Sequence, residues 1–387
     1  MKNIIFGLGK SGIAAGTYLV SQGQKVVGYD KEVMQAPFPV APLWSLEGID
    51  RVIVSPGIDP RCVEIQEAKQ KGVPVIGEME LGLQSLKKTE PAYVIGVTGS
   101  NGKTTTCMQL AHQMRKGKKI VFLLGNIGEP LCNYLQSPVK GATIILEMSS
   151  FQLETARTKA LDLAVVLNVF PNHLNRYENF SDYKQVKKEI VSLLKPGGKA
   201  VVGSALFEEM KTSFPQVIPG GNTIESIIQA LLEEMGQPGL DLTGFIPPSY
   251  RMQHITTWQE IAFYNDSKST NPAATIYAVS KIHRPIILLV GGLDKDLDYA
   301  LWKKRFSNKV QKVIAMGSCR EKIAKQLAPD YDVMKASCLQ DAWQKALSLA
   351  KPGDAILFSP GASSLDQFKN FEERGKAFTR LVTKLKD

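Results

Sequence analysis

The residues best suited to chemistry form a glycine-rich segment at positions 96–105, Gly-Val-Thr-Gly-Ser-Asn-Gly-Lys-Thr-Thr. It lies between an apolar run and a segment with helical periodicity. In such a loop the backbone N–H groups point at phosphate oxygens, and the start of the following helix adds positive potential. The Lys103 ammonium would reach the β- and γ-phosphates, and the Thr104 hydroxyl would bind Mg²⁺. The segment therefore predicts a nucleotide site.

The spacing of this loop departs from the strict phosphate-loop pattern at one position. The pattern G-x-x-x-x-G-K-[ST] requires glycine at position 97, where this chain has Val97, with glycines at 96 and 99 instead. The apolar run before the loop and the helical segment after it still favour nucleotide binding over a fortuitous turn. The loop residues expected to contact ATP are Gly99, Asn101, Gly102, Lys103, Thr104 and Thr105.

A second glycine turn, at positions 7–12, reads Gly-Leu-Gly-Lys-Ser-Gly and also follows an apolar run. Asp30 ends the next apolar run, 18 residues after Gly12. This pattern needs only a close backbone approach to a diphosphate and an acid placed for a ribose or a ring, so any nucleoside diphosphate would suit it. It leaves open a nicotinamide-dependent oxidoreductase and a purely structural turn.

Glu147 and His173 are candidate metal-binding residues in the middle of the chain. Glu147 ends an apolar run one strand and one helix after the phosphate loop, where phosphate-loop enzymes place a carboxylate for Mg²⁺. His173 follows the next such run. Because histidine is an unusual ligand for Mg²⁺, spacing alone favours a structural role for His173.

A predicted helix at 182–195 contains Lys184, Lys187 and Lys188. Lysines on a helix are by default solvated, because their charged ends remain in water. Periodicity therefore gives Lys187 no special role.

Two polar segments follow apolar runs in the last third of the chain. Residues 265–272 read Asn-Asp-Ser-Lys-Ser-Thr-Asn-Pro and lead into a helix, with Pro272 suited to its first turn. Residues 359–375 bring small side chains to the end of another run. Since open α/β sheets bind ligands at the carboxyl ends of their strands, both segments predict ligand contacts, although helix capping alone would explain the Ser and Thr residues.

Short apolar runs alternate with helix-like stretches along the whole chain, which is typical of parallel α/β architecture. A polar break at 86–93 and a proline-rich linker at 236–249 divide the chain into three blocks. The predicted strands are 2–6, 25–29, 51–54, 73–76, 93–98, 120–124, 143–147, 163–168, 199–202, 253–257, 260–265, 286–291, 312–316 and 355–358.

Composition describes an ordinary globular chain of 387 residues with 44% hydrophobic and 22% charged residues. The 47 basic and 37 acidic residues give a net charge of +10, which indicates either a polyanionic ligand or a lysine-rich surface. The sequence contains no basic stretch interleaved with aromatic residues, which is the pattern that would favour nucleic acid as the ligand. We expect a cytosolic protein without a membrane span. The five cysteines lack CxxC spacing, and we expect them to be buried free thiols.

Together these segments resemble those of the Mur ligases, ATP-dependent enzymes that form amide bonds in peptidoglycan precursor synthesis. The resemblance covers nearly the whole chain. Its most specific parts are residues 147–154, Glu-Met-Ser-Ser-Phe-Gln-Leu-Glu, and the Asp-Gln-Phe…Phe-Glu-Glu-Arg-Gly ending at 366–375. The segments that carry it are 96–106, 125–128, 147–154, 168–177, 250–252, 265–272 and 359–375.

Within that family the motifs look most like those of members that add D-glutamate to UDP-N-acetylmuramoyl-L-alanine. Folylpolyglutamate synthases share the phosphate loop and the central domain but resemble this chain less elsewhere. The resemblance implies a Rossmann-like UDP-substrate domain at 1–88, a central P-loop ATPase domain at 89–248, and a Rossmann-like amino-acid-binding domain at 249–387 that closes over the site. It also implies ATP and Mg²⁺ as cofactors, small-molecule substrates, and a cytoplasmic monomer.

The resemblance assigns roles residue by residue. The implied catalytic residues are Lys103, Glu147, His173, Lys187 and Lys268, of which Lys187 matches the family's carbamylated lysine. The implied metal site comprises Thr104, Glu147, His173 and Lys187. Further ATP contacts match Asn222, Arg251 and Asp266. The UDP substrate would contact Ser11, Gly12, Asp30, Ser55, Pro56, Gly57, Asn126, Ser149 and Gln152. D-glutamate would contact Thr270, Lys295, Ser364 and Phe371.

Two departures from the family pattern bear on these assignments. The usual Asp-His-Leu-Asp string reads Asn172-His-Leu-Asn175 here, which removes two carboxylates from the metal neighbourhood. The chain also looks short around 30–50 and 203–222. We expect Lys187, placed between Lys184 and Lys188, to favour its neutral amine. A carbamate on that amine would restore one negative charge.

Overall fold

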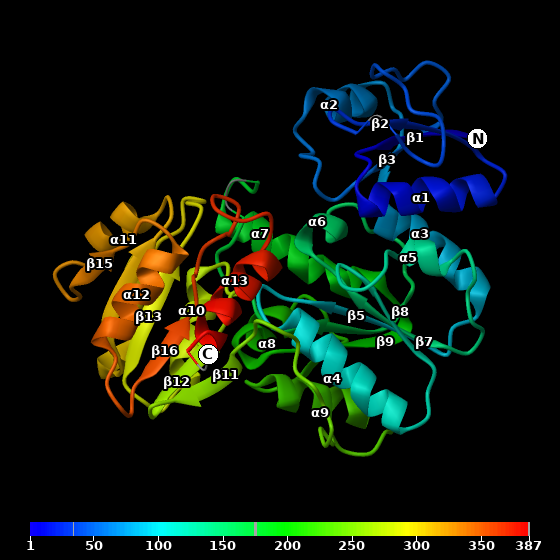
Figure 1. Ribbon diagram of the computed structural model, residues 1–387. Coiled ribbons are helices and arrows are strands. Elements are labelled where there is room, and N and C mark those ends of the chain that lie inside the picture. Colours follow the sequence, from blue (N-terminus) through cyan, green and yellow to red (C-terminus); the bar gives the residue numbers. More distant parts are fainter. Residues whose placement is uncertain (34, 174–175, 386–387) are drawn as a thin grey trace. The chain divides into compact units, whose positions relative to one another are not determined.

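The computed structural model describes residues 1–33, 35–173 and 176–385, and its chain builds three sheets of mostly parallel strands (Figure 1). The predicted α/β class with parallel sheets is confirmed. By contacts the chain forms two compact units, Met1–Pro171 with Asn179–Phe245, and Asn172–Glu178 with Ile246–Asp387. The first unit holds two of the sheets, and the second unit holds the third.

The first sheet contains four parallel strands in the order β2-β1-β3-β4. These strands are β1 (Lys2–Phe6), β2 (Lys25–Tyr29), β3 (Arg51–Val54) and β4 (Val75–Gly77). Its helices are α1 (Lys10–Ser21), α2 (Val63–Gln70) and α3 (Glu78–Leu86). The helix α3 follows β4 directly and leads toward the second sheet.

The second sheet contains six parallel strands in the order β10-β9-β8-β5-β7-β6. The strands are β5 (Tyr93–Thr98), β6 (Val121–Gly125), β7 (Thr143–Glu147), β8 (Leu161–Val166), β9 (Leu194–Val202) and β10 (Val217–Pro219). The helices are α4 (Lys103–Lys116), α5 (Leu131–Tyr134), α6 (Ser150–Leu153), α7 (Phe180–Lys188), α8 (Ser204–Lys211) and α9 (Ile224–Glu234).

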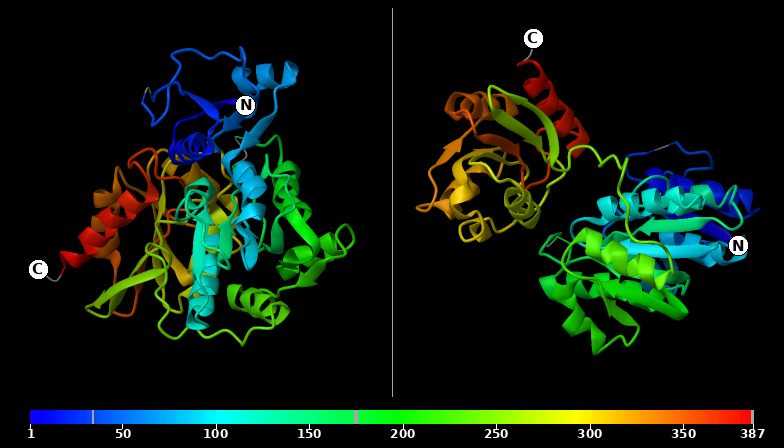
Figure 2. Two further views of the ribbon diagram at one scale, coloured as in Figure 1. Left: turned by 90° about the vertical axis from the view of Figure 1, so that its right-hand side faces the viewer. Right: turned by 90° about the horizontal axis from the view of Figure 1, so that it is seen from below.

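Alternation along the strands explains why both faces of the second sheet are covered. Ile144 and Leu146 pack into one buried cluster together with α3 and α5, whereas Ile145 packs into another with α4 and α9. Successive side chains of a strand point to opposite faces, and a continuous apolar run therefore needs helices on both sides. The views in Figure 2 show the helices on both sides of the strands.

The third sheet contains six strands in the order β11-β12-β16-β13-β14-β15, with one antiparallel pair, β11 and β12, at its edge. The strands are β11 (Gln253–Trp258), β12 (Ile261–Asn265), β13 (Ile286–Gly291), β14 (Val310–Met316), β15 (Val333–Lys335) and β16 (Ala355–Phe358). The helices α10 (Pro272–Lys281) and α11 (Arg320–Leu327) pack on one face, and α12 (Leu339–Leu349) and α13 (Phe371–Thr383) pack on the other.

The helix predicted at 182–195 is shorter in the structure. The helix α7 ends at Lys188, a 3₁₀ turn follows at Glu189–Leu193, and Leu194 already begins β9. The predicted end is wrong. Pro196 disfavours the helical conformation at Lys195, the residue before it, but the helix ends earlier, at Lys188.

The expectation of five buried thiols is confirmed for Cys107, Cys132 and Cys319 and wrong for the other two. Cys62 is half-buried and Cys338 is exposed. Cys62, Cys338 and the buried Cys319 all stand at N-cap positions of helices, so this position alone does not decide whether a thiol is buried.

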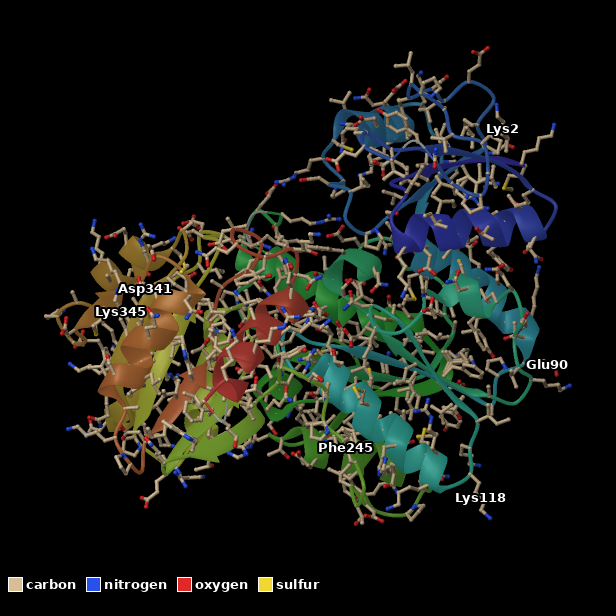
Figure 3. All side chains as sticks on the ribbon, viewed as in Figure 1. Lys2, Glu90, Lys118, Phe245, Asp341 and Lys345 are labelled. Atoms are coloured by element: carbon tan, nitrogen blue, oxygen red, sulfur yellow. The ribbon has the colours of Figure 1, made fainter. Side chains whose placement is uncertain are left out.

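Exposed lysines such as Lys2 and Lys118 are spread over the first unit (Figure 3). None of the helices within the described ranges is both long and apolar enough to cross a membrane.

Candidate functional site

The phosphate loop connects β5 to α4. Gly102 has φ of 88°, a left-handed conformation that favours glycine, and Lys103 is the first residue of the helix. The Lys103 ammonium donates to the Gly99 carbonyl oxygen at 2.8 Å. The predicted glycine turn and its lysine thus both lie at the start of α4, and their role in binding phosphate stays a prediction.

Side chains from two other elements hold the loop in shape. The Asn168 side chain accepts from the Asn101 N–H at 2.9 Å and donates to the Asn101 carbonyl at 3.1 Å. The Ser100 hydroxyl lies 3.0 Å from the Tyr183 hydroxyl of α7. Sequence reasoning missed Tyr183, although it stands four residues before Lys187 and therefore on the same face of the helix.

Lys187 is buried, with 1% of its surface exposed, so the expectation of a solvated side chain is wrong. Its ammonium nitrogen donates to the same Gly99 carbonyl as Lys103, at 3.1 Å. Burial, together with the charge of Lys103, holds the pKa of Lys187 well below the usual lysine value, against a smaller opposite effect of Glu147.

The expected source of that effect is also wrong. Lys184 and Lys188 both form ion pairs with Glu209 and do not appear among the causes that shift the pKa of Lys187. The like charge that lowers the pKa of Lys187 comes from Lys103. Because Lys103 lies on a different helix, the spacing of residues along α7 could not predict this effect.

Glu147 is buried at the end of β7, and its carboxylate has two defined partners. It accepts from the Thr104 hydroxyl at 2.7 Å and from the Asn126 amide at 2.7 Å. A carboxylate beside a hydroxyl is a hard oxygen donor set, which fits Mg²⁺ that keeps waters and phosphate oxygens as its other ligands. Within the described residues, no group of three or more His, Cys, Asp and Glu side chains forms a cage for a metal.

His173 belongs to the second compact unit, together with Asn172. Its backbone has φ of 56°, and its N–H donates to the Asn172 side chain at 3.0 Å. Glu147 and Lys187 belong to the other compact unit, so the metal-binding role of His173 stays a prediction. Asn175, the other departure from the family string, lies outside the described residues.

A cavity of about 480 Å³ opens beside the first glycine turn. One part of its lining follows β1, β2 and β3 of the first sheet, and the other part comes from segments after β6 and β7 of the second sheet. The predicted UDP-substrate residues on its wall are Ser11, Asp30, Ser55, Pro56, Gly57, Asn126 and Gln152. Further lining residues include Gly7, Lys10, Gly125, Gly128 and Pro130.

Two predicted residues outside this lining have structural roles next to it. A Cβ atom on Gly12 would lie 1.9 Å from the Gly7 carbonyl oxygen, so only glycine allows the turn to close. The Ser149 hydroxyl accepts from the Gln152 N–H and thereby caps α6, which presents Gln152 to the cavity.

Asp30 closes the glycine turn rather than standing free. One carboxylate oxygen accepts from the Leu8 N–H at 2.6 Å, and the other accepts from Glu32 and Val33. Although burial acts to raise it, these backbone donors hold the pKa of Asp30 below its usual value. The carboxylate is therefore ionised at the cavity mouth.

Lys10 is a lining residue that sequence reasoning missed, because it occupies a variable position of the glycine pattern. Its ammonium donates to the Gly128 carbonyl at 2.8 Å and approaches the Glu129 carboxylate at 3.3 Å. It thus connects the glycine turn to the opposite rim.

We expect Lys10→Ala to weaken binding of a uridine diphosphate ligand about two- to fivefold, because an exposed cation contributes at most ~1 kcal/mol. The effect should shrink as salt is raised. Titration calorimetry with UDP at low and high salt measures it, and Lys2→Ala, which removes an exposed lysine outside the cavity lining, is the matched control. Equal losses in both variants would contradict the assignment.

In the second unit, Asp266 follows β12 and is fully enclosed. It accepts from the Ser269 hydroxyl, from the Ser359 hydroxyl at 2.7 Å and from the Met252 N–H at 3.0 Å. Burial raises the pKa of the Asp266 carboxyl to about 6, against these hydrogen bonds and the charge of Arg251.

Lys268 and Phe371 are brought together by this loop. The Lys268 ammonium lies 3.7 Å from the centre of the Phe371 ring, a cation–π contact. The predicted phosphate-side lysine and one predicted D-glutamate residue are therefore neighbours.

Arg374 is a buried residue that the sequence analysis did not single out within its motif. Its guanidinium donates to the Ser267 hydroxyl and carbonyl at 3.1 and 2.8 Å and to the Ala362 carbonyl at 3.0 Å. Burial lowers its pKa to about 10. It joins the loop that carries Lys268 to the loop that carries Ser364.

The other predicted D-glutamate residues lie on loops at the carboxyl ends of neighbouring strands. Ser364 is buried, and the adjacent Ser363 pairs its backbone with Leu293, two residues before the half-buried Lys295. The Gly361 N–H donates to the Ser269 carbonyl, next to Thr270. The backbone thus joins the three loops.

The predicted ATP contacts divide between the two units. Asn222 is exposed in the first unit, on the turn before α9. Arg251, Asp266 and Lys268 belong to the second unit.

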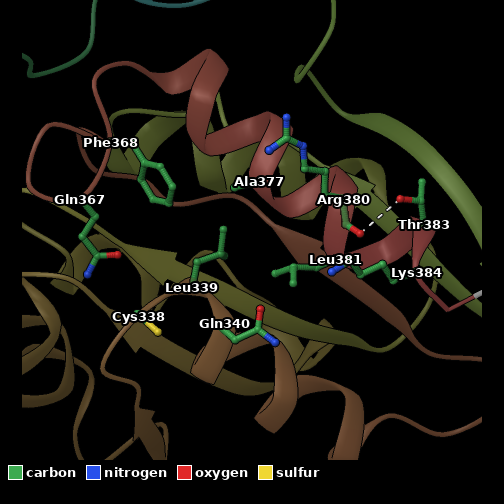
Figure 4. A pocket seen from close by; sticks show the side chains of 10 residues that line it. All are labelled: Cys338, Leu339, Gln340, Gln367, Phe368, Ala377, Arg380, Leu381, Thr383 and Lys384. Carbon is green, nitrogen blue, oxygen red and sulfur yellow. Dashed lines mark hydrogen bonds between the residues drawn. The ribbon is translucent and has the colours of Figure 1, made fainter.

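A larger cavity, of about 900 Å³, lies between α12 and α13 (Figure 4). Leu339, Phe368 and Leu381 form part of its wall, and Cys338 and Arg380 also line it. It contains none of the predicted site residues, so volume alone does not locate the chemistry.

Two family profiles match the chain. Residues 97–216 match the Mur ligase middle domain, and residues 250–361 match the profile described as Mur ligase, glutamate ligase domain.

Two curated relatives are similar to the chain over almost its whole length, and both are named UDP-N-acetylmuramoylalanine--D-glutamate ligase. The relative from Protochlamydia amoebophila is 34% identical, and the match covers 98% of this chain and 97% of the relative. The relative from Caldanaerobacter subterraneus is 32% identical, with 99% and 98% covered.

Among solved structures, the UDP-N-acetylmuramate-alanine ligase MurC from Thermotoga maritima superposes with a TM-score of 0.59 at 15% identity, covering 99% of both chains. At that identity the likeness shows a shared fold.

Proposed function

Because this chain belongs to the Mur ligase family, we propose that it joins D-glutamate to UDP-N-acetylmuramoyl-L-alanine with consumption of ATP. The observation that carries this proposal is the full-length similarity to relatives with that named activity. The cavity beside Asp30 supports it, since it is lined by most of the residues expected to hold the UDP substrate.

The three sheets would correspond to three domains with separate tasks. The first sheet with residues 1–88 would hold the UDP substrate, the second with residues 89–248 would hold ATP, and the third with residues 249–387 would hold D-glutamate. We also propose a cytoplasmic monomer, which the resemblance to the family implies.

The proposed chemistry is acyl activation followed by amide formation. A free carboxylate is a poor electrophile, so ATP would transfer its γ-phosphoryl group to the L-alanyl carboxylate and form an acyl phosphate. The D-glutamate amine would then attack the carbonyl carbon, and the phosphate would leave from the tetrahedral intermediate. Lys103 and Lys268 would neutralise charge as phosphoryl transfer brings two anions together.

Mg²⁺ bound near Thr104 and Glu147 would withdraw charge from the phosphate oxygens. The Asn126 amide, which donates to Glu147, would fix the orientation of that carboxylate. Asn126 also lines the UDP cavity. This shared contact would couple the position of the muramoyl substrate to the position of the phosphates.

A product-resolved assay tests the proposal. We expect phosphate release to require both UDP-N-acetylmuramoyl-L-alanine and D-glutamate, and a product that carries one added glutamyl residue by mass. L-glutamate is the control amino acid and should give no product. Stimulation by a folate with L-glutamate would instead support a folylpolyglutamate synthase. Tight NADH binding measured by fluorescence would favour an oxidoreductase, and absence of D-glutamate-dependent turnover would favour a non-enzymatic nucleotide-binding protein.

A further inference from the structure

Helix α3 carries two carboxylates into the interior of the first unit. Glu78 is 1% exposed and Glu80 is 3% exposed. Among the residues that the structure describes, no lysine or arginine side chain forms an ion pair with either. A buried carboxylate without a cationic partner is costly unless hydrogen bonds compensate it, so the partners of these two groups indicate their role.

Most partners of Glu80 lie on the turn that follows α6. One oxygen accepts from the N–H groups of Arg157 and Thr158 at 2.6 and 2.9 Å, and the other accepts from the Thr158 hydroxyl at 2.6 Å and from the Gln84 amide of α3 itself at 2.8 Å. Gln152 of α6 lines the cavity a few residues earlier. Glu80 therefore anchors the segment that presents Gln152.

The partner of Glu78 lies at the start of α5. Its Oε1 accepts from the Cys132 N–H at 2.8 Å, directly after the segment 125–130 that lines the same cavity. Its Oε2 is buried and has no hydrogen-bond partner among the described residues. Glu78 thus holds one of the two second-sheet segments of the cavity wall, and Glu80 holds the other.

The helix itself is fixed to the other wall. It continues directly from β4, which pairs with β3, and β3 leads into the cavity residues Ser55, Pro56 and Gly57. The helix α3 is therefore covalently part of one wall and hydrogen-bonded to the other.

We propose that Glu78 and Glu80 are positioning residues that hold the two walls of the UDP-substrate cavity in register. The link to substrate rests on the proposed function. Neither residue lines the cavity, so they act through Gln152 and through segment 125–130.

The electrostatics of Glu78 make the stability of the contact between α3 and α5 depend on pH. Burial raises the pKa of Glu78 to about 7, against the hydrogen bonds from Cys132. The ionisable group in contact with it is the buried Cys132 thiol on α5, which supplies no positive charge. Since the folded-state pKa lies above the ordinary value of 4.5, the free energy of unfolding falls as pH rises from about 4.5 to about 7 and is level above that.

Two variants and a matched control test the proposal. Glu80→Ala removes the acceptor for the N–H groups of Arg157 and Thr158, and Glu78→Ala removes the acceptor for the N–H of Cys132. We expect each to weaken binding of UDP-N-acetylmuramoyl-L-alanine about ten- to hundredfold by calorimetry, because a buried donor loses its partner. ATP affinity should change less than about twofold. Glu208→Gln, an exposed glutamate on α8, is the matched control and should bind like the wild type.

A second readout does not depend on substrate. Hydrogen–deuterium exchange should accelerate at 150–158 in Glu80→Ala and at 125–132 in Glu78→Ala. Glu78→Gln keeps an acceptor oxygen but cannot ionise, so its urea-unfolding free energy should fall less between about pH 5 and 7 than that of the wild type.

The outcomes separate the two proposals. If the wild type binds the UDP substrate and the alanine variants of Glu78 and Glu80 bind it equally well, the positioning role is wrong. If the wild type binds no UDP compound, the proposed function fails, and the exchange rates alone decide the positioning role. Unchanged exchange at both segments overturns it in either case.

Discussion

Lys187→Ala is expected to lower the rate of D-glutamate ligation by two to three orders of magnitude, about what loss of a central electrostatic group costs. The side chain is buried, lies beside Lys103, and donates to the carbonyl that Lys103 also uses. Its lowered pKa makes the neutral amine available. A neutral amine adds carbon dioxide to form a carbamate and releases one proton.

A carbamate at this position would account for the large loss. It would place a negative charge beside Lys103, close to the carboxylate of Glu147. It would orient Lys103 or bind Mg²⁺ together with Glu147. The alanine variant should keep its fold and its affinity for UDP, because the UDP cavity is lined by other residues.

The control for this experiment is Lys184→Ala, on the same helix, where the lysine pairs with Glu209 near the surface. Short carboxylates such as formate or acetate should restore part of the activity of Lys187→Ala and none in Lys184→Ala. Full activity of Lys187→Ala, or of wild-type protein freed of carbon dioxide, would contradict the carbamate.

Lys295→Ala should raise the KM for D-glutamate about ten- to hundredfold while the KM for ATP changes little. An ammonium that binds one carboxylate of the amino acid contributes roughly 1.5–3 kcal/mol, and an unpaired carboxylate would remain in the variant. Lys295 lies half-buried on the loop that the backbone joins to the Ser364 segment. Steady-state kinetics with each substrate varied in turn measures the difference.

Lys303 and Lys304 lie near Lys295 in the sequence, and Lys304→Ala is the better control of the two. Lys304 is exposed, whereas Lys303 pairs with Asp330 at 2.8 Å and contributes to the local fold. Equal increases in both KM values for Lys295→Ala would show that the side chain supports the domain and does not select the amino acid.

Short-range chemistry explains what the sequence could predict. Lys103 and Thr104 are recognisable because the loop, strand and helix that place them are contiguous. Asp30 is recognisable for the same reason. Glu147 needs only the rule that parallel strands end at one edge of the sheet.

Long-range contacts explain what the sequence could not predict. Burial of Lys187 depends on the packing of α7 against a loop 88 residues earlier, as the contact with Gly99 shows. Lys10 and Arg374 resemble ordinary surface charges in sequence, and only tertiary structure reveals their carbonyl partners. Glu78 resembles a helix-starting acid, because an acid in a first turn is common at the surface.

The strand order of the first two sheets has a consequence for synthesis on the ribosome. Every pairing in the first sheet lies between Lys2 and Gly77, so this sheet can form as soon as that stretch has emerged. In the second sheet, β5 pairs with β7 and β8, and Ile95 must wait for Leu163. Distant pairing slows folding, so the nascent central strand β5 stays exposed for longer than any strand of the first sheet. Within the first two sheets, β5 is therefore the strand that waits longest for its last partner, β8.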